Sequence, residues 1–190
     1  PDGKTGDGCG LLLGKPDAFL RGVAADSGFS IADRYAVGSL FVNLDAALAT
    51  RSRDALTQYL TAEGLEIAGW RDTPTDPGAL GEEALASMPG LLQVFINAPQ
   101  GMDDEQFEAR LFVARRRTEI AIDDDPMFYI ASLSSHVISY KGLMMPANLP
   151  VFYPDLRDER MASHVAVFHQ RFSTNTLPQW RLAQPFRFLA

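Results

Sequence analysis

The chain has 190 residues, of which 46% are hydrophobic and 22% charged, and its 17 basic and 24 acidic residues give a formal net charge of −7. This composition is typical of a globular protein with a sizeable core and excludes a disordered chain. The negative charge argues against sequence-independent binding of nucleic acid, which depends on phosphate neutralisation by Lys and Arg. No apolar stretch approaches the roughly 18 residues of a membrane span, so we expect a soluble, cytoplasmic protein without a membrane partner.

The first half of the chain is predicted to contain strands around one helix. Apolar side chains recur at helical spacing from about 45 to 63, where Asn43 or Asp45 can cap the helix and Gly64 can end it. A connector rich in turn residues follows at 72–78. Short apolar runs bounded by turn residues predict the strands, which cover residues 11–13, 35–44, 65–70 and 91–97.

A second helix is predicted to begin at Asp103 or Asp104, either of which can cap it, and to end before Pro126. The basic cluster 115–117 is expected to lie largely outside its apolar stripe, and the acidic residues 123–125 to form a solvated loop at its end. The buried stripe is predicted to consist of Phe107, Leu111, Ala114, Thr118 and Ala121.

Three further strands complete the predicted order. Residues 127–132 and 136–140 are predicted to form a β-hairpin across 133–135, and residues 164–168 a further buried strand. Because strands and helices are mixed and include a hairpin, the sequence favours an α+β fold over a strictly alternating parallel sheet. No domain boundary is better supported than the connector at 72–81, so residues 1–190 are expected to belong to one domain.

Two features near the start of the chain have alternative interpretations. The glycines of residues 6–10 could let backbone N–H groups approach a phosphate, but their spacing matches neither a Walker loop nor the dinucleotide fingerprint. Cys9 could be a nucleophile, or a small buried residue in a tight loop, as its flanking glycines favour. It is the only cysteine, so an intrachain disulfide and a multi-cysteine zinc site are excluded. We expect Cys9 to be buried, with no His or Lys close enough to lower its pKa.

The polar residues 169–176 directly follow the predicted strand at 164–168. Arg171 could bind a carboxylate through two parallel hydrogen bonds, or it could hold the turn together by donating to the turn's own carbonyls. The residue types alone do not separate these two roles. The three histidines, His136, His164 and His169, show no metal-binding spacing, so we predict no metal site.

The stretch from His169 to Thr176, continued by Pro178, Trp180 and residues 182–187, resembles a signature of the glutamate synthase large-subunit family. The resemblance is to its N-terminal class II glutamine amidotransferase domain, and it implies a four-layer αββα sandwich of the N-terminal-nucleophile hydrolase type. Further matches in the same order are Thr5–Gly8 with Gly10, Gly69–Asp72, Gln93–Phe95, Phe128–Ile130, Tyr140–Gly142 and Phe152–Asp158.

The resemblance implies an enzyme that hydrolyses glutamine to glutamate and ammonia. In this family an N-terminal cysteine attacks the side-chain amide, its own α-amino group acts as the base, and the ammonia is passed to 2-oxoglutarate in nitrogen assimilation. The implied FMN and iron–sulfur cluster belong to other domains, so no cofactor is expected in this chain. The implied partners are glutamine, those other domains and a small electron-transfer subunit, in the cytoplasm or a plastid.

Two departures from the family pattern bear on activity. The family's nucleophile lies upstream of the Thr5–Gly8 motif, and its oxyanion donors lie just beyond residue 190, so we expect no catalytic residue in this chain. Cys9 stands where relatives usually carry alanine and has no free α-amino group. The expected substrate-binding residues are Arg171, which would hold the α-carboxylate of glutamine, and Phe172, Ser173 and Thr174. The alternative is a catalytically silent binding or structural module of the same fold.

Overall fold

The computed structural model describes residues 5–170 and 177–187. These residues combine helices with antiparallel sheets, so the predicted α+β class is confirmed. The chain forms two compact units, the first from residues 1–19, 73–88 and 139–190 and the second from residues 20–72 and 89–138. The chain passes from the second unit to the first after Asp72, which lies in the predicted connector.

The second unit is built on a four-stranded sheet in the order β3-β4-β2-β5. Its strands are β2 (Tyr35–Val42), β3 (Glu66–Asp72), β4 (Gly90–Asn97) and β5 (Tyr129–Ser134). Each neighbouring pair is antiparallel, and β2 pairs with β4 over its full length. All eight residues of β2 are buried, because this strand lies in the interior of the sheet.

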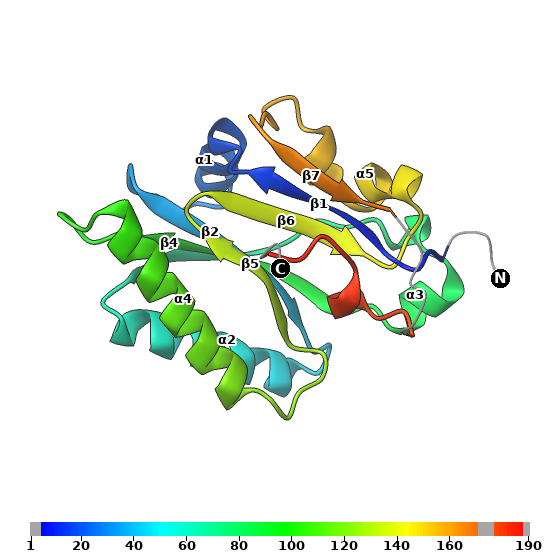
Figure 1. The fold of residues 1–190 in the computed structure, drawn as a ribbon, viewed down its shortest axis with the longest axis horizontal. Coiled ribbons are helices and arrows are strands. Elements are labelled where there is room, and N and C mark those ends of the chain that lie inside the picture. Colours follow the sequence, from blue (N-terminus) through cyan, green and yellow to red (C-terminus); the bar gives the residue numbers. More distant parts are fainter. Residues whose placement is uncertain (1–4, 171–176, 188–190) are drawn as a thin grey trace. The chain divides into compact units, whose positions relative to one another are not determined.

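Two long helices, α2 (Ala46–Ala62) and α4 (Asp104–Ala121), lie side by side on this sheet (Figure 1). Asp45 and Asp103 are their caps, and each carboxylate accepts hydrogen bonds from backbone N–H groups of the first turn. Both helices are therefore confirmed, and the structure selects Asp45 and Asp103 from the alternative caps. The core between helices and sheet includes Leu40, Leu56, Leu60, Val94, Ile96, Phe107, Leu111 and Ile130.

The expectations for the second helix and its end hold for most of their residues and are corrected at one residue each. Arg115 is only 4% exposed: its guanidinium lies 5.0 Å from the ring centroid of Phe112, and its Nη1 lies 2.9 Å from both carboxylate oxygens of Glu119. Ala121, predicted to be buried, is exposed in the last turn. Asp125 is buried rather than solvated, since its carboxylate accepts a hydrogen bond from the Asn43 side chain at 3.1 Å.

The first unit contains a three-stranded sheet in the order β6-β1-β7, with β1 in the middle (Figure 1). The strands are β1 (Cys9–Gly14), β6 (Val137–Gly142) and β7 (Ala166–His169), and β1 and β7 are antiparallel. The short helices α3 (Glu82–Ala86) and α5 (Leu149–Phe152) also belong to this unit. A further helix, α1 (Asp17–Asp26), is not among the predicted elements.

The predicted hairpin is wrong, because β5 and β6 belong to different sheets. β5 pairs with β2, whereas β6 pairs with β1. Each of the two strands therefore forms its backbone hydrogen bonds with a strand other than its neighbour in the sequence. Glu108 on α4 holds the connection instead: its carboxylate accepts from the Ser135 N–H at 2.6 Å and from the Ser135 hydroxyl at 2.7 Å.

The last strand was predicted to be buried, and this is also wrong. The residues of β7 are alternately exposed and half-buried, and Phe168 is 68% exposed. Among the described residues, no helix combines the length and the apolar character needed to cross a membrane.

Candidate functional site

The four residues predicted to bind substrate, Arg171, Phe172, Ser173 and Thr174, lie outside the described residues. The chain on either side of them is described: β7 ends at His169, and the segment 177–187 follows. Several of the family motifs meet around this second segment in the first unit.

The glycines near the start of the chain serve close packing. A Cβ on Gly10 would lie 2.5 Å from Lys141 Cβ and 2.8 Å from the carbonyl oxygen of Gln184. Gly8 has a φ of +122°, and a Cβ there would lie 2.9 Å from Ala183 Cβ. The space beside these two glycines is thus filled by protein atoms. Packing, not a phosphate cradle, explains them.

Lys141 joins β6 to the segment that follows the predicted substrate-binding turn. Its side chain is buried, and Nζ donates to the carbonyl oxygens of Arg181 at 3.0 Å and Ala183 at 2.7 Å. The same amine lies 5.1 Å from the ring centroid of Phe186. A buried amine is costly unless it is hydrogen-bonded, so these carbonyls are held in place by Lys141.

Burial and, to a smaller extent, the positive charge of Arg187 together lower the pKa of Lys141 to about 7. Desolvation penalises the ammonium, because burial removes the water that would otherwise stabilise its charge. Lys141 is therefore poised to change its charge near neutral pH.

Two buried tyrosines support Lys141 from the Phe152–Asp158 motif and from β6. The Tyr153 hydroxyl donates to the carbonyl oxygen of Lys141 at 2.8 Å, and the Tyr140 hydroxyl donates to the buried Asp155 carboxylate at 3.1 Å. Their rings meet edge to face with centroids 5.2 Å apart. Burial raises the pKa of Tyr153, so its hydroxyl remains a donor.

Trp180 anchors the other side of the segment. Its indole Nε1 donates to the carbonyl oxygen of Ala84 at 3.2 Å, and its ring centroid lies 5.7 Å from that of Phe152. A Cβ on Gly142 would lie 2.5 Å from the indole ring, so this position also requires the absence of a side chain. The Tyr140–Gly142 motif thus contributes to both anchors.

Cys9 has the features of a structural residue. Its side chain is 1% exposed, and burial raises the pKa of its thiol to about 12. The thiolate is the reactive form of cysteine, so Cys9 is not activated at neutral pH. The expectation that Cys9 is buried is confirmed.

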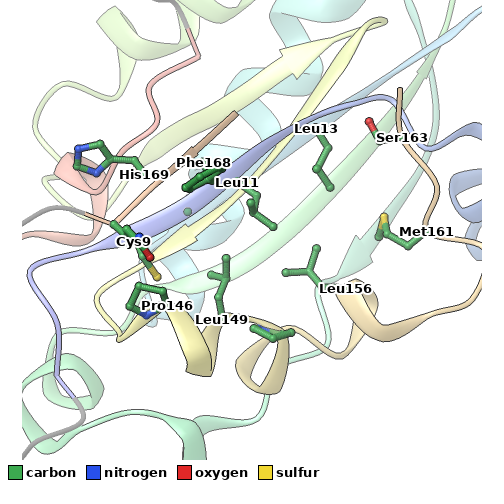
Figure 2. A pocket seen from close by; sticks show the side chains of 13 residues that line it. Cys9, Leu11, Leu13, Pro146, Leu149, Leu156, Met161, Ser163, Phe168 and His169 are labelled. Atoms are coloured by element: carbon green, nitrogen blue, oxygen red, sulfur yellow. The ribbon is translucent and has the colours of Figure 1, made fainter. Parts of the chain in front are cut away.

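A pocket of about 390 Å³ opens on the side of β1 that carries Cys9. Figure 2 shows Leu11 and Leu13 along this strand, with Phe168 from the neighbouring strand beside them. The side chains of Pro146, Leu149, Leu156 and Met161 form another part of its lining. The described residues that line it include no Lys, Arg, Asp or Glu.

The histidines do not assemble a metal centre within residues 5–170 and 177–187, where no group of three His, Cys, Asp or Glu side chains is placed to hold a metal ion. His169 Nδ1 is buried and has no hydrogen-bond partner in the described part of the chain.

Two motifs of the second unit form a cross-strand pair. Arg71 on β3 and Gln93 on β4 are opposite each other in the register, and Arg71 Nη1 donates to Gln93 Oε1 at 2.7 Å. Gln93 is fully buried, so this hydrogen bond satisfies a polar group in the core. Gly69 admits the ring of Phe29, which would lie 2.4 Å from a Cβ at that position. These motif residues have a structural explanation.

Comparison with known proteins identifies the family. Residues 1–190 match the family model described as class II glutamine amidotransferases. The chain belongs to this family. The resemblance predicted from the motifs is therefore confirmed, together with the N-terminal-nucleophile hydrolase type of fold that the family has.

Relatives of the chain come from bacteria and plants. It is 43% identical over 195 residues to the large chain of NADPH glutamate synthase from Azospirillum brasilense, and 40% identical over 190 residues to that of Bacillus subtilis (strain 168). It is 36% identical over 193 residues to the chloroplastic ferredoxin-dependent glutamate synthase 2 of Arabidopsis thaliana. These alignments cover 99–100% of the chain but only 12–13% of each relative.

The buried Lys141 predicts a pH dependence of stability. Its pKa falls from 10.5 to about 7 on folding, so between these values the unfolded chain binds a proton that the folded chain does not. The free energy of unfolding should therefore rise with pH across this window, by an amount on the order of a few kcal/mol. Urea unfolding of the wild type and of Lys141→Met at several pH values measures the difference.

The Lys141→Met variant should lose this rise, whereas the matched control Lys15→Met should keep it. Parallel pH curves for wild type and Lys141→Met would show that Lys141 does not titrate in the window.

Because its thiol is buried, Cys9 is predicted to react slowly with thiol reagents. A thiol reagent at neutral pH should label Cys9 in the native protein far more slowly than in urea, because the thiolate is both rare and inaccessible. Mass spectrometry of the Cys9 peptide after timed labelling measures the rate. Equal rates in native and denatured protein would contradict the buried, structural role.

Proposed function

We propose that this chain is the glutamine-hydrolysing domain of a glutamate synthase large chain. Its ammonia would be used to convert 2-oxoglutarate to glutamate in nitrogen assimilation. The observation that carries the proposal is the alignment of the whole chain with one part of several glutamate synthases. The names of these relatives give different electron donors. The similarity therefore supports the glutamine reaction that they share, but it does not support a particular electron donor.

Arg171, Phe172, Ser173 and Thr174 are proposed to bind glutamine. A guanidinium can hold the α-carboxylate with two parallel hydrogen bonds, which gives both charge and orientation. The support comes from the family motif, and from the anchoring of the chain on either side: β7 pairs with β1, and Lys141 binds residues 181 and 183.

We propose that the nucleophile is an N-terminal cysteine thiolate outside these residues, because Cys9 is buried, has a raised pKa and lacks a free α-amino group. The thiolate attacks the side-chain carbonyl carbon, and the C–N bond breaks as the α-ammonium gives a proton to the leaving ammonia. Water then hydrolyses the thioester to glutamate and restores the thiol.

The cofactors implied for the full-length relatives do not fit the residues present here. An iron–sulfur cluster is held by several cysteine thiolates, and this chain has one cysteine, which is buried. Within the part of the chain that the structure describes, the apolar pocket offers no Lys or Arg side chain for the phosphate of FMN. FMN and the cluster are therefore assigned to other domains, with which this domain would work in the cytoplasm or a plastid, alongside a small electron-transfer subunit.

A second candidate is a silent binding or structural module. The observation in its favour is that the only cysteine of the chain is not activated. A glutaminase assay on the complete natural protein distinguishes the two functions. Activity supports the amidotransferase, whereas a complete absence of activity in the folded protein supports the module.

The 190 residues expressed alone should not release ammonia from glutamine. They lack the proposed nucleophile with its coupled base, and loss of such a unit reduces rates by several orders of magnitude. A coupled glutamate assay on the purified polypeptide measures this. Turnover that Cys9→Ala abolishes would instead make Cys9 the nucleophile.

Replacing Arg171 by lysine in the complete protein should weaken glutamine binding by roughly 1–3 kcal/mol, because lysine keeps the charge but loses one of the two parallel hydrogen bonds. The effect should be a higher KM for glutamine, while ammonia-dependent glutamate formation stays near normal. The matched control is Arg116→Lys, which lies exposed on α4.

Steady-state kinetics with glutamine and with ammonia read out both reactions. If Arg171→Lys lowers the melting temperature and leaves the KM for glutamine unchanged, then Arg171 holds the turn together and does not bind substrate.

A further inference from the structure

The proposed glutamine-binding residues 171–174 lie in the sequence between two points of the chain that both meet Gly10. His169, at the end of β7, is opposite Gly10 in the β1–β7 register. The carbonyl oxygen of Gln184 also lies against Gly10, since a Cβ there would be 2.8 Å from it. The chain therefore leaves the sheet after His169 and returns to Gly10 at Gln184.

The two ends of this excursion are held in different ways. His169 is held by the backbone pairing of β7 with β1. At the returning end, residues 180–184 belong to neither described sheet, and Lys141 Nζ donates to the carbonyl oxygens of Arg181 at 3.0 Å and Ala183 at 2.7 Å. Ala183 is 2% exposed, so loss of the amine would leave a buried acceptor unsatisfied. The returning end thus depends on a side chain in a way that the departing end does not.

Lys141 is itself fixed relative to β1. A Cβ on Gly10 would lie 2.5 Å from Lys141 Cβ, so the backbones of β1 and β6 are in close contact at this point. The Tyr153 hydroxyl donates to the carbonyl oxygen of Lys141 at 2.8 Å and holds it from the other direction along the chain. The amine is therefore a fixed point from which the returning end takes its position.

We propose that Lys141 is a positioning residue of the glutamine site, whose amine fixes the returning chain at residues 181–183 and thereby keeps residues 171–174 in their binding conformation. This inference rests on the proposed function. In this role Lys141 acts through the chain and needs no contact with glutamine. When only a fraction of the molecules has the competent conformation, the apparent dissociation constant rises by the inverse of that fraction, whereas bound molecules react normally.

Steady-state kinetics of Lys141→Met in the complete protein test this role. Methionine is also long and unbranched but has no N–H donor, so the variant removes the two hydrogen bonds with little change of shape. We expect the KM for glutamine to rise about tenfold or more, with kcat and ammonia-dependent glutamate formation within about twofold of wild type. A merely structural role would instead reduce the amount of active protein. That would lower the apparent kcat and leave the KM unchanged, and this result would overturn the inference.

Tyr140→Phe is the matched control. Tyr140 is the neighbour of Lys141 on β6, and the substitution removes a buried hydroxyl that donates to Asp155 at 3.1 Å but leaves the hydrogen bonds of Lys141 to residues 181 and 183. Its melting temperature should fall, while its KM for glutamine should stay within about twofold of wild type. An equal rise of the KM in both variants would assign the effect to general loss of packing and overturn the inference.

Hydrogen exchange of the wild-type protein gives a second test, which does not depend on how well a variant folds. Coupling is reciprocal: if the fixed segment favours ligand binding, a bound ligand must favour the fixed segment. The N–H groups of Leu182 and Ala183 report on this segment, because they donate to the carbonyl oxygen of Gln179 at 2.9 and 3.2 Å. Glutamate, the product, should slow their exchange about threefold or more at a concentration that inhibits glutamine hydrolysis. Unchanged exchange at both amides would overturn the inference.

The outcomes also distinguish this inference from the proposed function. A folded wild-type protein without glutaminase activity would overturn both. An active wild type whose Lys141→Met variant keeps the normal KM for glutamine would overturn the inference alone. A raised KM with a normal kcat in Lys141→Met, a normal KM in Tyr140→Phe and slower exchange at Leu182 and Ala183 together support it.

Discussion

The buried amine of Lys141 is the constraint on which the organisation of the first unit depends. Its hydrogen bonds to residues 181 and 183 replace the water that the amine loses on burial. A shift of either carbonyl would leave a buried donor without its acceptor, which costs more than an ordinary hydrogen bond contributes. The segment after the predicted substrate-binding turn is thereby tied to β6.

The other motif residues of this unit make that arrangement sterically feasible. Gly10 lets β1 approach Lys141 and residue 184, and Tyr153 satisfies the Lys141 carbonyl. Trp180 adds a second anchor through Ala84. These residues account for packing, whereas the proposed contacts with glutamine belong to Arg171 and its three neighbours. The pocket on the Cys9 side of β1 is lined mostly by apolar side chains among the described residues.

Local signals predicted the long elements of the second unit well. The helix over 45–63 and the helix starting at Asp103 were predictable, because caps and apolar periodicity act within a few residues of each other. Partner choice was not predictable in this way. The segments at 127–132 and 136–140 have the spacing of a hairpin, yet each pairs with a distant strand. The exposure of β7 was also not predictable, because an apolar strand sequence does not show whether another element covers the strand.

The sequence by itself determined the α+β class and the family, because composition, periodicity and ordered motifs are properties of the chain alone. Only the tertiary structure decided what individual groups do. The pKa values of Cys9 and Lys141 are set mainly by the removal of water around them, and this depends on packing between segments far apart in the sequence, such as Gly10 against Lys141. The same holds for the glycines at 8 and 10, whose need for a missing side chain appears only when residues 141, 183 and 184 are packed against them.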